Sequence, residues 1–588
     1  MQNALLLYLR LFVSLIILVF ASYSAPDIFS LFHQSAEPEL VMSFFSMALI
    51  FALSFGIFYL SKGTKIPSFV VAIFFGMAAK PLLVPVIEQH TLLSVLVGFG
   101  ATLILFGGGL ETPFQNFKKL LGKITALSFP GLLITAFLFS LSIFFLSPKL
   151  GQGLSVTAAI LLGAILASTD PAAIIPILKK LRFNNPETKD LIISESAVTD
   201  VTGTLLTVVF LSTLASTGLI GSSISSGYQV IFSAASGVFL LKQLAFGTLF
   251  GFLGYLLLNA LTQFKSSHNK EHEVDSAFFL FIPIMIFTLA LALGGSGYLA
   301  AFIAGLLFVT SEHLEETERF FNHIIDGFFK PTIFLLLGAL VDIPALIEYA
   351  PIGIASAALF MFVIRPLSTF VVLSPFLLKQ KDKMTWREIA FISCVRETGA
   401  IPAVLLVTIA SLNISGIEGL LPIGMWIILA TLIVEPPITP WIASKLRVAE
   451  IIHDTEPESD NDKSYVALGT RGNSYENRLP IVAQFASDHG IPKVTLMLCL
   501  EYKYQPKLEQ EIHENAFRLF EKINQDLLKA GRSAIEFRFY SSAGFLQENI
   551  DYIAKNDPHA VVIFVGRKML DYRLKEVKKL AVPLRFME

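Results

Sequence analysis

Long apolar stretches recur along this chain from its N-terminus to about residue 445, and they limit the possible folds more than any other feature. A helix needs about 20 mostly apolar residues to cross the hydrocarbon core of a bilayer. Only 15% of the 588 residues are charged, which is too few to cover the surface of a water-soluble protein of this size. The sequence therefore predicts a polytopic α-helical membrane protein with about 13–14 spans, centred near residues 14, 51, 75, 101, 135, 167, 201, 245, 285, 303, 332, 362, 399 and 432.

Lysine and arginine are concentrated in alternate loops between these stretches. The basic loops contain Lys62 and Lys65, then Lys118, Lys119 and Lys123, then Lys179, Lys180 and Arg182, then Lys265 and Lys270, and finally Lys379, Lys381, Lys383 and Arg387. The intervening loops carry acids such as Glu37 and Glu348, with Lys149 as a lone basic residue. Because loops rich in Lys and Arg stay in the cytoplasm, the pattern predicts a protein of the cell (inner) membrane with a cytoplasmic C-terminus.

The N-terminus allows two interpretations. Residues 5–20 are almost wholly apolar, with Arg10 near their start, so they are nearly long enough for a first spanning helix. The small residues between Ala21 and Ala25 also suit the cleavage site of a signal peptide. We favour a retained helix because of the length of the apolar run, and removal of residues 1–25 stays open.

The composition changes after Arg447, and we expect three parts: a transmembrane domain (1–447), a polar acidic linker (448–463) and a small cytoplasmic α/β domain (464–588). Short buried strands are predicted at 465–468, 494–498, 535–539 and 560–565, with helices near 477–489, 508–530, 546–555 and 572–580. Strands that alternate with helices favour a parallel sheet. Residues 469–472 (GTRG) match no phosphate-binding fingerprint, so a tight turn explains them better than a nucleotide site.

Other partners and cofactors find little support. The net charge of −2 gives no reason to expect a nucleic-acid partner. Cys394 and Cys499 lie far apart in the sequence and form no disulfide framework or metal-ligand spacing. We therefore expect no cofactor and no enzymatic activity.

The first group of candidate residues is Thr169 and Asp170, in the segment ASTDP (167–171) of an otherwise apolar stretch. Pro171 disfavours a helical conformation at the preceding residue, so the span is expected to break there. A break at membrane depth is tolerated only where it is buried in protein or lines a cavity, and its half-helix ends can hold ions. A proline kink with a capping Asp is the plainer alternative.

The second group is the segment SESAVTD (194–200) in the next span. Ser196 and Asp200 are four residues apart and share a helix face, whereas Glu195 and Asp200 do not. A hard monovalent cation prefers oxygen ligands, and burial disfavours the charged form of a carboxylate. Asp200 can therefore hold either a proton or a cation, and Glu195 is expected to form a structural ion pair.

The third group is basic. Arg365 precedes a proline, and Arg396 and Glu397 lie in a second span that is interrupted by glycine and proline (CVRETGAIP). Two interrupted spans in separate halves of the chain predict an inverted repeat with its site at the midplane. Buried cations there need anionic partners. The alternative is that either arginine extends to the cytoplasmic interface.

Taken in order, TDP, ESxxTD, RPL and the Gly-Ala-containing broken span resemble the sodium/proton exchanger branch of the monovalent cation/proton antiporter superfamily, over roughly residues 40–445. The segment LFGGGLE (105–111) is similar to an early helix of that family. The resemblance implies a mobile core bundle packed against a dimerisation domain, and hence a homodimer. The C-terminal region resembles a universal-stress-protein module.

The resemblance also implies roles for individual residues. Asp200 would be the carboxylate that alternates between H+ and Na+ or K+, and Asp170 and Thr169 would lie where the broken helices cross. Ser196 and Thr199 would add oxygen ligands. Glu195 would pair with Arg365, and Arg396 would offset the half-helix dipoles.

This chain departs from the family pattern at two places. Thr199 stands where the exchanger branch has Asn and the electrogenic branch has Asp, so one carboxylate remains at that pair and electroneutral exchange is expected. Glu397 follows Arg396 and could neutralise it. Two competing functions remain: a ligand-gated potassium efflux system, and a membrane-anchored sensor that uses the transport fold as a scaffold.

Overall fold

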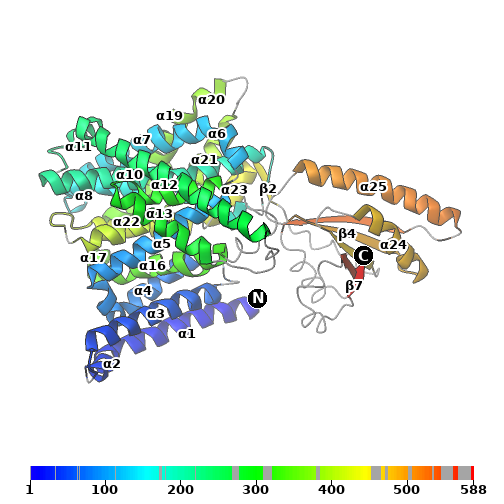
Figure 1. Cartoon of the computed structure of the whole chain (residues 1–588), viewed down its shortest axis with the longest axis horizontal. Helices are drawn as coiled ribbons and strands as arrows, with labels where there is room; N and C mark the ends of the chain where they lie inside the picture. The colour runs from blue at the N-terminus through cyan, green and yellow to red at the C-terminus, as the bar shows by residue number, and fades with distance from the viewer. Residues whose placement is uncertain are drawn as a thin grey trace. The chain divides into compact units, whose positions relative to one another are not determined.

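The computed structural model describes residues 2–33, 35–61, 64, 66–112, 114–170, 175–178, 181–218, 220–267, 277–308, 321–378, 384–412, 414–451, 465–470, 475–500, 506–530, 532, 535–543, 560–566 and 584–587. The chain divides into two compact units, one of residues 1–178 and 183–450 and one of residues 179–182 and 451–588. The first unit is helical and the second contains a parallel sheet (Figure 1).

The first unit is built mainly from helices of nine or more residues. They are α1 (Gln2–Tyr23), α3 (Pro38–Ser61), α4 (Ser68–Ile87), α5 (His90–Glu111), α6 (Phe114–Ala126), α7 (Leu132–Leu146), α8 (Val156–Leu166), α10 (Pro186–Thr217), α12 (Ala234–Ser267), α13 (Ala277–Ala292), α14 (Gly297–Leu307), α16 (Lys330–Leu340), α18 (Ala350–Leu359), α19 (Arg365–Leu373), α21 (Trp386–Cys394), α22 (Ala400–Ser411) and α23 (Leu420–Lys445). Shorter turns of helix are α2 (Ala25–Phe32), α9 (Ile175–Leu178), α11 (Ile224–Gln229), α17 (Ile343–Glu348), α20 (Pro375–Leu378), η2 (Pro148–Leu150) and η3 (Val230–Phe232).

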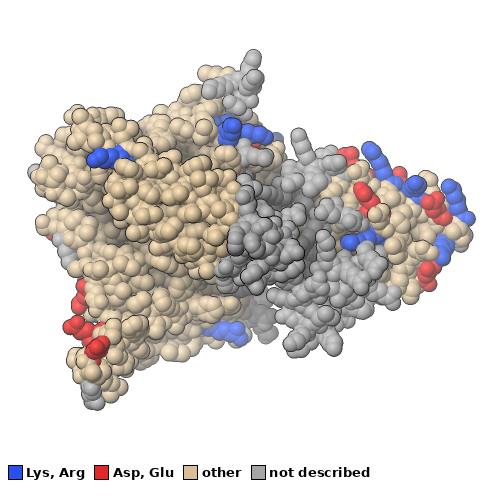
Figure 2. All heavy atoms as spheres, in the orientation of Figure 1, with Lys and Arg blue, Asp and Glu red and all other residues tan. Residues whose placement is uncertain are grey.

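These helices confirm the prediction of a polytopic membrane protein. Within the described residues, nine helices are long and apolar enough to cross a membrane, and the pair α1 and α2, bent by 53°, makes a tenth. Four shorter apolar helices are α8, α13, α14 and α22. The face in Figure 2 is almost free of charged side chains over this unit, as expected of a surface that contacts lipid.

Both predicted interruptions are present. A non-helical segment follows α8, with 168–170 as its described residues, and another separates α21 from α22 at residues 395–399. Pro171, which prompted the first expectation, lies outside the described residues. Each break leaves half-helix ends inside the unit, where their backbone groups need partners from the protein.

Three wide π-helical turns accompany prolines in other spans. They are η1 (Leu127–Gly131), η5 (Ile325–Phe329) and η6 (Phe360–Ile364). Pro130 lies within η1, while Pro331 and Pro366 follow η5 and η6 by two residues. Because proline has no N–H to donate, the ladder of i to i−4 hydrogen bonds is lost at each of these positions and the helix widens locally.

Small residues let the spanning helices approach closely. Gly338 on α16 faces the backbone of Ile73 on α4, and Gly76 on α4 faces the backbone of Leu335 on α16. A Cβ at either glycine would overlap a carbonyl oxygen of the partner helix. Close packing of this kind is a main source of helix association in a bilayer, where burial from water contributes nothing.

The second unit is a five-stranded sheet in the order β5-β4-β3-β6-β7, and every neighbouring pair is parallel. The strands are β3 (Tyr465–Thr470), β4 (Lys493–Leu500), β5 (Glu536–Ala543), β6 (Ala560–Gly566) and β7 (Leu584–Met587). The helices α24 (Tyr475–Asp488) and α25 (Pro506–Lys529) connect the first three strands, as parallel pairing requires. Two short strands, β1 (Leu181–Phe183) and β2 (Ala449–Ile451), pair separately.

The sequence predicted four of these five strands and both described helices, and it missed β7. The helices expected at 546–555 and 572–580 lie outside the described residues, as do residues 471 and 472 of the GTRG segment. The core of the sheet unit is apolar, with Leu468, Val494 and Leu496 fully buried beneath residues of α24 and α25.

We predict that Gly338→Ala destabilises the membrane unit by about 1–3 kcal/mol, since its Cβ has no room beside Ile73. The control is Gly98→Ala, because Gly98 also lies in a spanning helix but its added Cβ meets nothing within 4 Å. That control should be neutral or stabilising by up to about 1 kcal/mol. Thermal unfolding of the two purified variants in detergent checks the difference, and equal melting temperatures would contradict it.

Candidate functional site

The two non-helical segments meet each other inside the membrane unit. The backbone N–H of Asp170 donates to the carbonyl oxygen of Glu397 at 3.0 Å. The Asp170 carboxylate accepts a hydrogen bond from the backbone N–H of Ala400, the first residue of α22, at 2.9 Å. Asp170 therefore caps the N-terminus of α22, where a negative charge also meets the positive end of the helix dipole.

Gly399 makes this crossing possible. A Cβ at this position would overlap the side chain of Asp170. The residue before α22 must therefore lack a side chain for the Asp170 carboxylate to reach the helix end, which gives the Gly-Ala step of the second broken span a physical reason.

Arg365 satisfies the other half-helix end. Its guanidinium donates from Nη2 to the carbonyl oxygens of Leu166, at 3.4 Å, and Ser168, at 3.2 Å. These are carbonyls at and just beyond the C-terminus of α8, where a positive charge is favourable. The same nitrogen donates to the Thr398 hydroxyl at 2.9 Å, so Arg365 links the two breaks. Its side chain is only 1% exposed, and its Nη1 lies 3.9 Å from Glu435 Oε1.

The prediction that Glu195 pairs with Arg365 is wrong. Glu195 Oε1 instead pairs with Arg396 Nη2 at 2.5 Å, and Arg396 also donates to the Thr369 hydroxyl at 2.9 Å. The two arginines have thus exchanged the roles predicted for them, because Arg365 and not Arg396 contacts the end of a half-helix. Arg396 thus has Glu195 as a counter-charge, and the Glu397 carbonyl oxygen accepts the hydrogen bond from the backbone N–H of Asp170.

The helix α10 carries the second group of candidate residues through the middle of the unit. Asn185 caps its start, where its side chain accepts from the N–H of Glu187, and Gly218 ends it in a left-handed conformation with a φ of 74°. Ser196 donates to the carbonyl oxygen of Thr169, and the hydroxyls of Thr169 and Thr199 lie 3.0 Å apart. These contacts fix α10 against the first break.

Asp200, like Glu397 and Glu435, has a buried carboxylate oxygen without a donor among the described residues, but of these three only Asp200 lines the cavity described below. Its side chain is buried at 6% exposure, yet its Oδ1 accepts no hydrogen bond from any residue that the structure describes. A buried carboxylate oxygen without a donor is costly unless it binds a proton or a cation. Asp170 and Glu195, by contrast, are engaged by a helix end and by an arginine.

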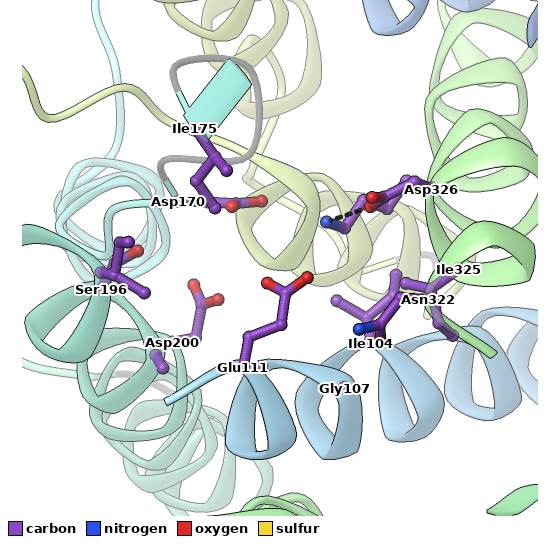
Figure 3. A pocket seen from close by; sticks show the side chains of 14 residues that line it. Ile104, Gly107, Glu111, Asp170, Ile175, Ser196, Asp200, Asn322, Ile325 and Asp326 are labelled. Carbon is purple, nitrogen blue, oxygen red and sulfur yellow. Dashed lines mark hydrogen bonds and ion pairs between the residues drawn. The ribbon is translucent and has the colours of Figure 1, made fainter. Parts of the chain in front are cut away.

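Asp200, Asp170 and Ser196 line a common cavity of about 50 Å³, which is room for a few water molecules or a partly hydrated cation. Figure 3 shows the carboxylates of Asp200, Asp170 and Glu111 directed toward this space from different elements. Thr169 and Thr199 are not among the residues that line the cavity, and their hydroxyls contact each other.

The opposite wall contains functional candidates that the sequence analysis missed. Asn322 precedes η5, Asp326 lies on η5, and Lys330 begins α16. Two charged residues, four apart in an apolar span (IIDGFFKP), were the available signal. Among the described residues, no three His, Cys, Asp or Glu side chains form a group suited to hold a metal ion.

We predict that Glu195→Gln destabilises the protein by about 3–5 kcal/mol, because it leaves the buried Arg396 without its counter-charge. Asp342→Asn is the control, since Asp342 is 63% exposed and pairs with Lys80 at 3.8 Å. Loss of that exposed pair should cost about 1 kcal/mol or less. Thermal unfolding measures both, and a Glu195→Gln protein as stable as the control would contradict the buried ion pair.

Comparison with known proteins shows which family the chain belongs to. Residues 49–445 match the family model described as "Sodium/hydrogen exchanger, transmembrane". A K(+)/H(+) antiporter, NhaP2 of Shewanella oneidensis, is 26% identical over 351 residues, which cover 59% of this chain and 57% of that protein. The Na(+)/H(+) antiporter 1 of Methanocaldococcus jannaschii is 25% identical over 386 residues, which cover 63% of this chain and 84% of that protein.

The chain therefore spans less than two thirds of the length of the K(+)/H(+) antiporter relative named first. Among solved structures, the sodium proton antiporter MjNhaP1 of Methanocaldococcus jannaschii at pH 8 aligns with 69% of this chain with a TM-score of 0.54 and 22% identity, so the two share a fold. The family model covers most of the chain, including both broken helices and every candidate residue, and the protein belongs to the sodium/hydrogen exchanger family.

Proposed function

We propose that this protein is a secondary active antiporter that exchanges Na+ or K+ for H+ across the membrane. One observation carries the proposal: Asp200 places a buried carboxylate oxygen, without a donor among the described residues, on a cavity inside the membrane unit. Membership of the exchanger family and the names of the antiporter relatives support it.

Asp200 is the residue that we propose binds the transported ions. Its carboxylate takes either a proton or a cation, and the competition between them couples the two fluxes. Ser196 and Asp170 line the same cavity and supply further oxygens to the cation. Thr169 and Thr199, whose hydroxyls contact each other, hold the first break and α10 in register.

Electroneutral one-for-one exchange is the stoichiometry that we propose. Thr199 precedes Asp200 and carries no charge, so this pair of positions holds one carboxylate. The other acid of this segment, Glu195, is paired with Arg396 and is not free to exchange a proton with each cycle. One cation then replaces one proton on the same carboxylate.

The setting of the transporter is also a proposal. The distribution of Lys and Arg supports an inner-membrane protein with its C-terminus in the cytoplasm. We propose a homodimer, as the family resemblance implies. The order of the parallel sheet supports a universal-stress-protein-like regulatory domain at the C-terminus.

We predict that Asp200→Asn abolishes exchange, because an amide can neither bind a proton nor balance a cation. The assay follows internal pH in proteoliposomes after Na+ or K+ is added. Asp342→Asn is the matched control and should retain transport, since Asp342 is exposed and does not line the cavity. Cation flux that persists without proton movement would favour a ligand-gated efflux path, and no flux of either cation in the wild type would favour a sensor.

Electroneutrality predicts that the wild-type protein moves no net charge. A sodium or potassium concentration jump on proteoliposomes adsorbed to a solid-supported membrane should give no current above that of Asp200→Asn, while the pH assay shows transport under the same conditions. A sustained current that depends on cation concentration would contradict one-for-one exchange.

A further inference from the structure

A positively charged side chain faces the candidate ion site from the opposite wall of its cavity. Lys330 begins α16, and its ammonium pairs with the Asp326 carboxylate at 2.8 Å. Both residues line the cavity that contains Asp200 and Asp170. Figure 3 shows Asp326 across this space from Asp200, with the dashed line marking its ion pair.

The π-helical turn η5 gives this pair its position. The N–H of Lys330 donates to the carbonyl oxygen of Ile325, five residues earlier, in place of the usual partner four residues earlier. This wide turn brings both Asp326 and Lys330 to the cavity, while the rest of α16 packs against α4. Wide turns of this kind within α-helices are often found at functional sites.

The charges around the cavity are unequal in number. Among its described lining residues, Glu111, Asp170, Asp200 and Asp326 are acidic and Lys330 alone is basic. The carboxylates of Asp326, Asp170 and Glu111 all attract the Lys330 ammonium. Such an ammonium is a compact charge on a flexible stem of four carbons, and it can change carboxylate partners without movement of the backbone.

A lysine in this place is unfavourable for a transported cation, since like charges repel in a cavity of low dielectric. It is favourable for the empty site, where four acidic side chains line one cavity at membrane depth. The side chain of Lys330 is 12% exposed, so solvent screens its charge only weakly.

We propose that Lys330 is a tethered counter-ion of the empty site. When no cation is bound, its ammonium moves from Asp326 toward the carboxylates of Asp200 and Asp170. An arriving Na+ or K+ displaces it back to Asp326. Lys330 thereby sets the affinity for the transported cation, and Asp326 holds the displaced charge. This inference rests on the proposed role of Asp200.

The test compares variants on the two sides of the ion pair. Lys330→Met removes the competing charge, so the KM for the cation should fall about tenfold, equivalent to ~1.4 kcal/mol. Asp326→Asn removes the alternative partner and should raise KM, because Lys330 then stays on the ion site. The double variant should resemble Lys330→Met, and Lys330→Arg, which keeps the charge, should not lower KM.

Opposite shifts of KM in the two single variants indicate a competing charge. If the pair were only structural, its loss would shift KM in the same direction in both single variants. The dependence of thermal stability on Na+ or K+ concentration gives a second measure of affinity that needs no transport. If Lys330→Met does not fold, the KM values of Asp326→Asn and Lys330→Arg still test whether the Lys330 charge competes with the cation.

Active wild type with unchanged or equally shifted KM values in the two single variants would overturn the inference alone. Inactive wild type, in the same liposomes and with either cation, would overturn the proposed function together with it.

Discussion

The membrane unit contains two interrupted helices whose non-helical segments cross. Its arrangement depends on hydrogen-bond partners for the backbone groups at the interrupted ends. Backbone groups freed at this depth have no water to bind, and each one left alone costs on the order of several kcal/mol. The Asp170 carboxylate binds the start of α22, and the Arg365 guanidinium binds the end of α8. Each charge also opposes the helix dipole at the end that it contacts.

This crossing assigns a separate task to each buried acid. Asp170 is held by the N-terminus of α22, and Glu195 is held by Arg396 on the second broken span. Asp200 keeps one carboxylate oxygen without a donor among the described residues, on the wall of the cavity. The contacts that stabilise the broken helices engage Asp170 and Glu195 and leave Asp200, on the cavity wall, available for ions. Gly399 is required because no side chain fits between Asp170 and α22.

The sequence predicted the fold class, both interruptions and three cavity residues, because apolar length and isolated charges in apolar spans are local signals. It could not tell which of two arginines meets Glu195, since both lie far along the chain and only the crossing of helices decides the pairing. Lys330 and Asp326 lie inside the span Phe321–Leu340, and they were missed because only the folded helices show that this span faces the same cavity as Asp200. Strand β7 has four described residues, too few for a recognisable alternation.

The most direct test of the account is a count of protons released when the purified protein binds its cation. Calorimetric titration with Na+ or K+ in buffers of different ionisation enthalpy gives that number without any transport assay. The account predicts about one proton released per cation bound in the wild type near the pH at which the carboxylate is protonated, as competition for a single carboxylate requires, and no proton release by Asp200→Asn. Cation binding without proton release in the wild type would contradict the claim that both ions compete for Asp200.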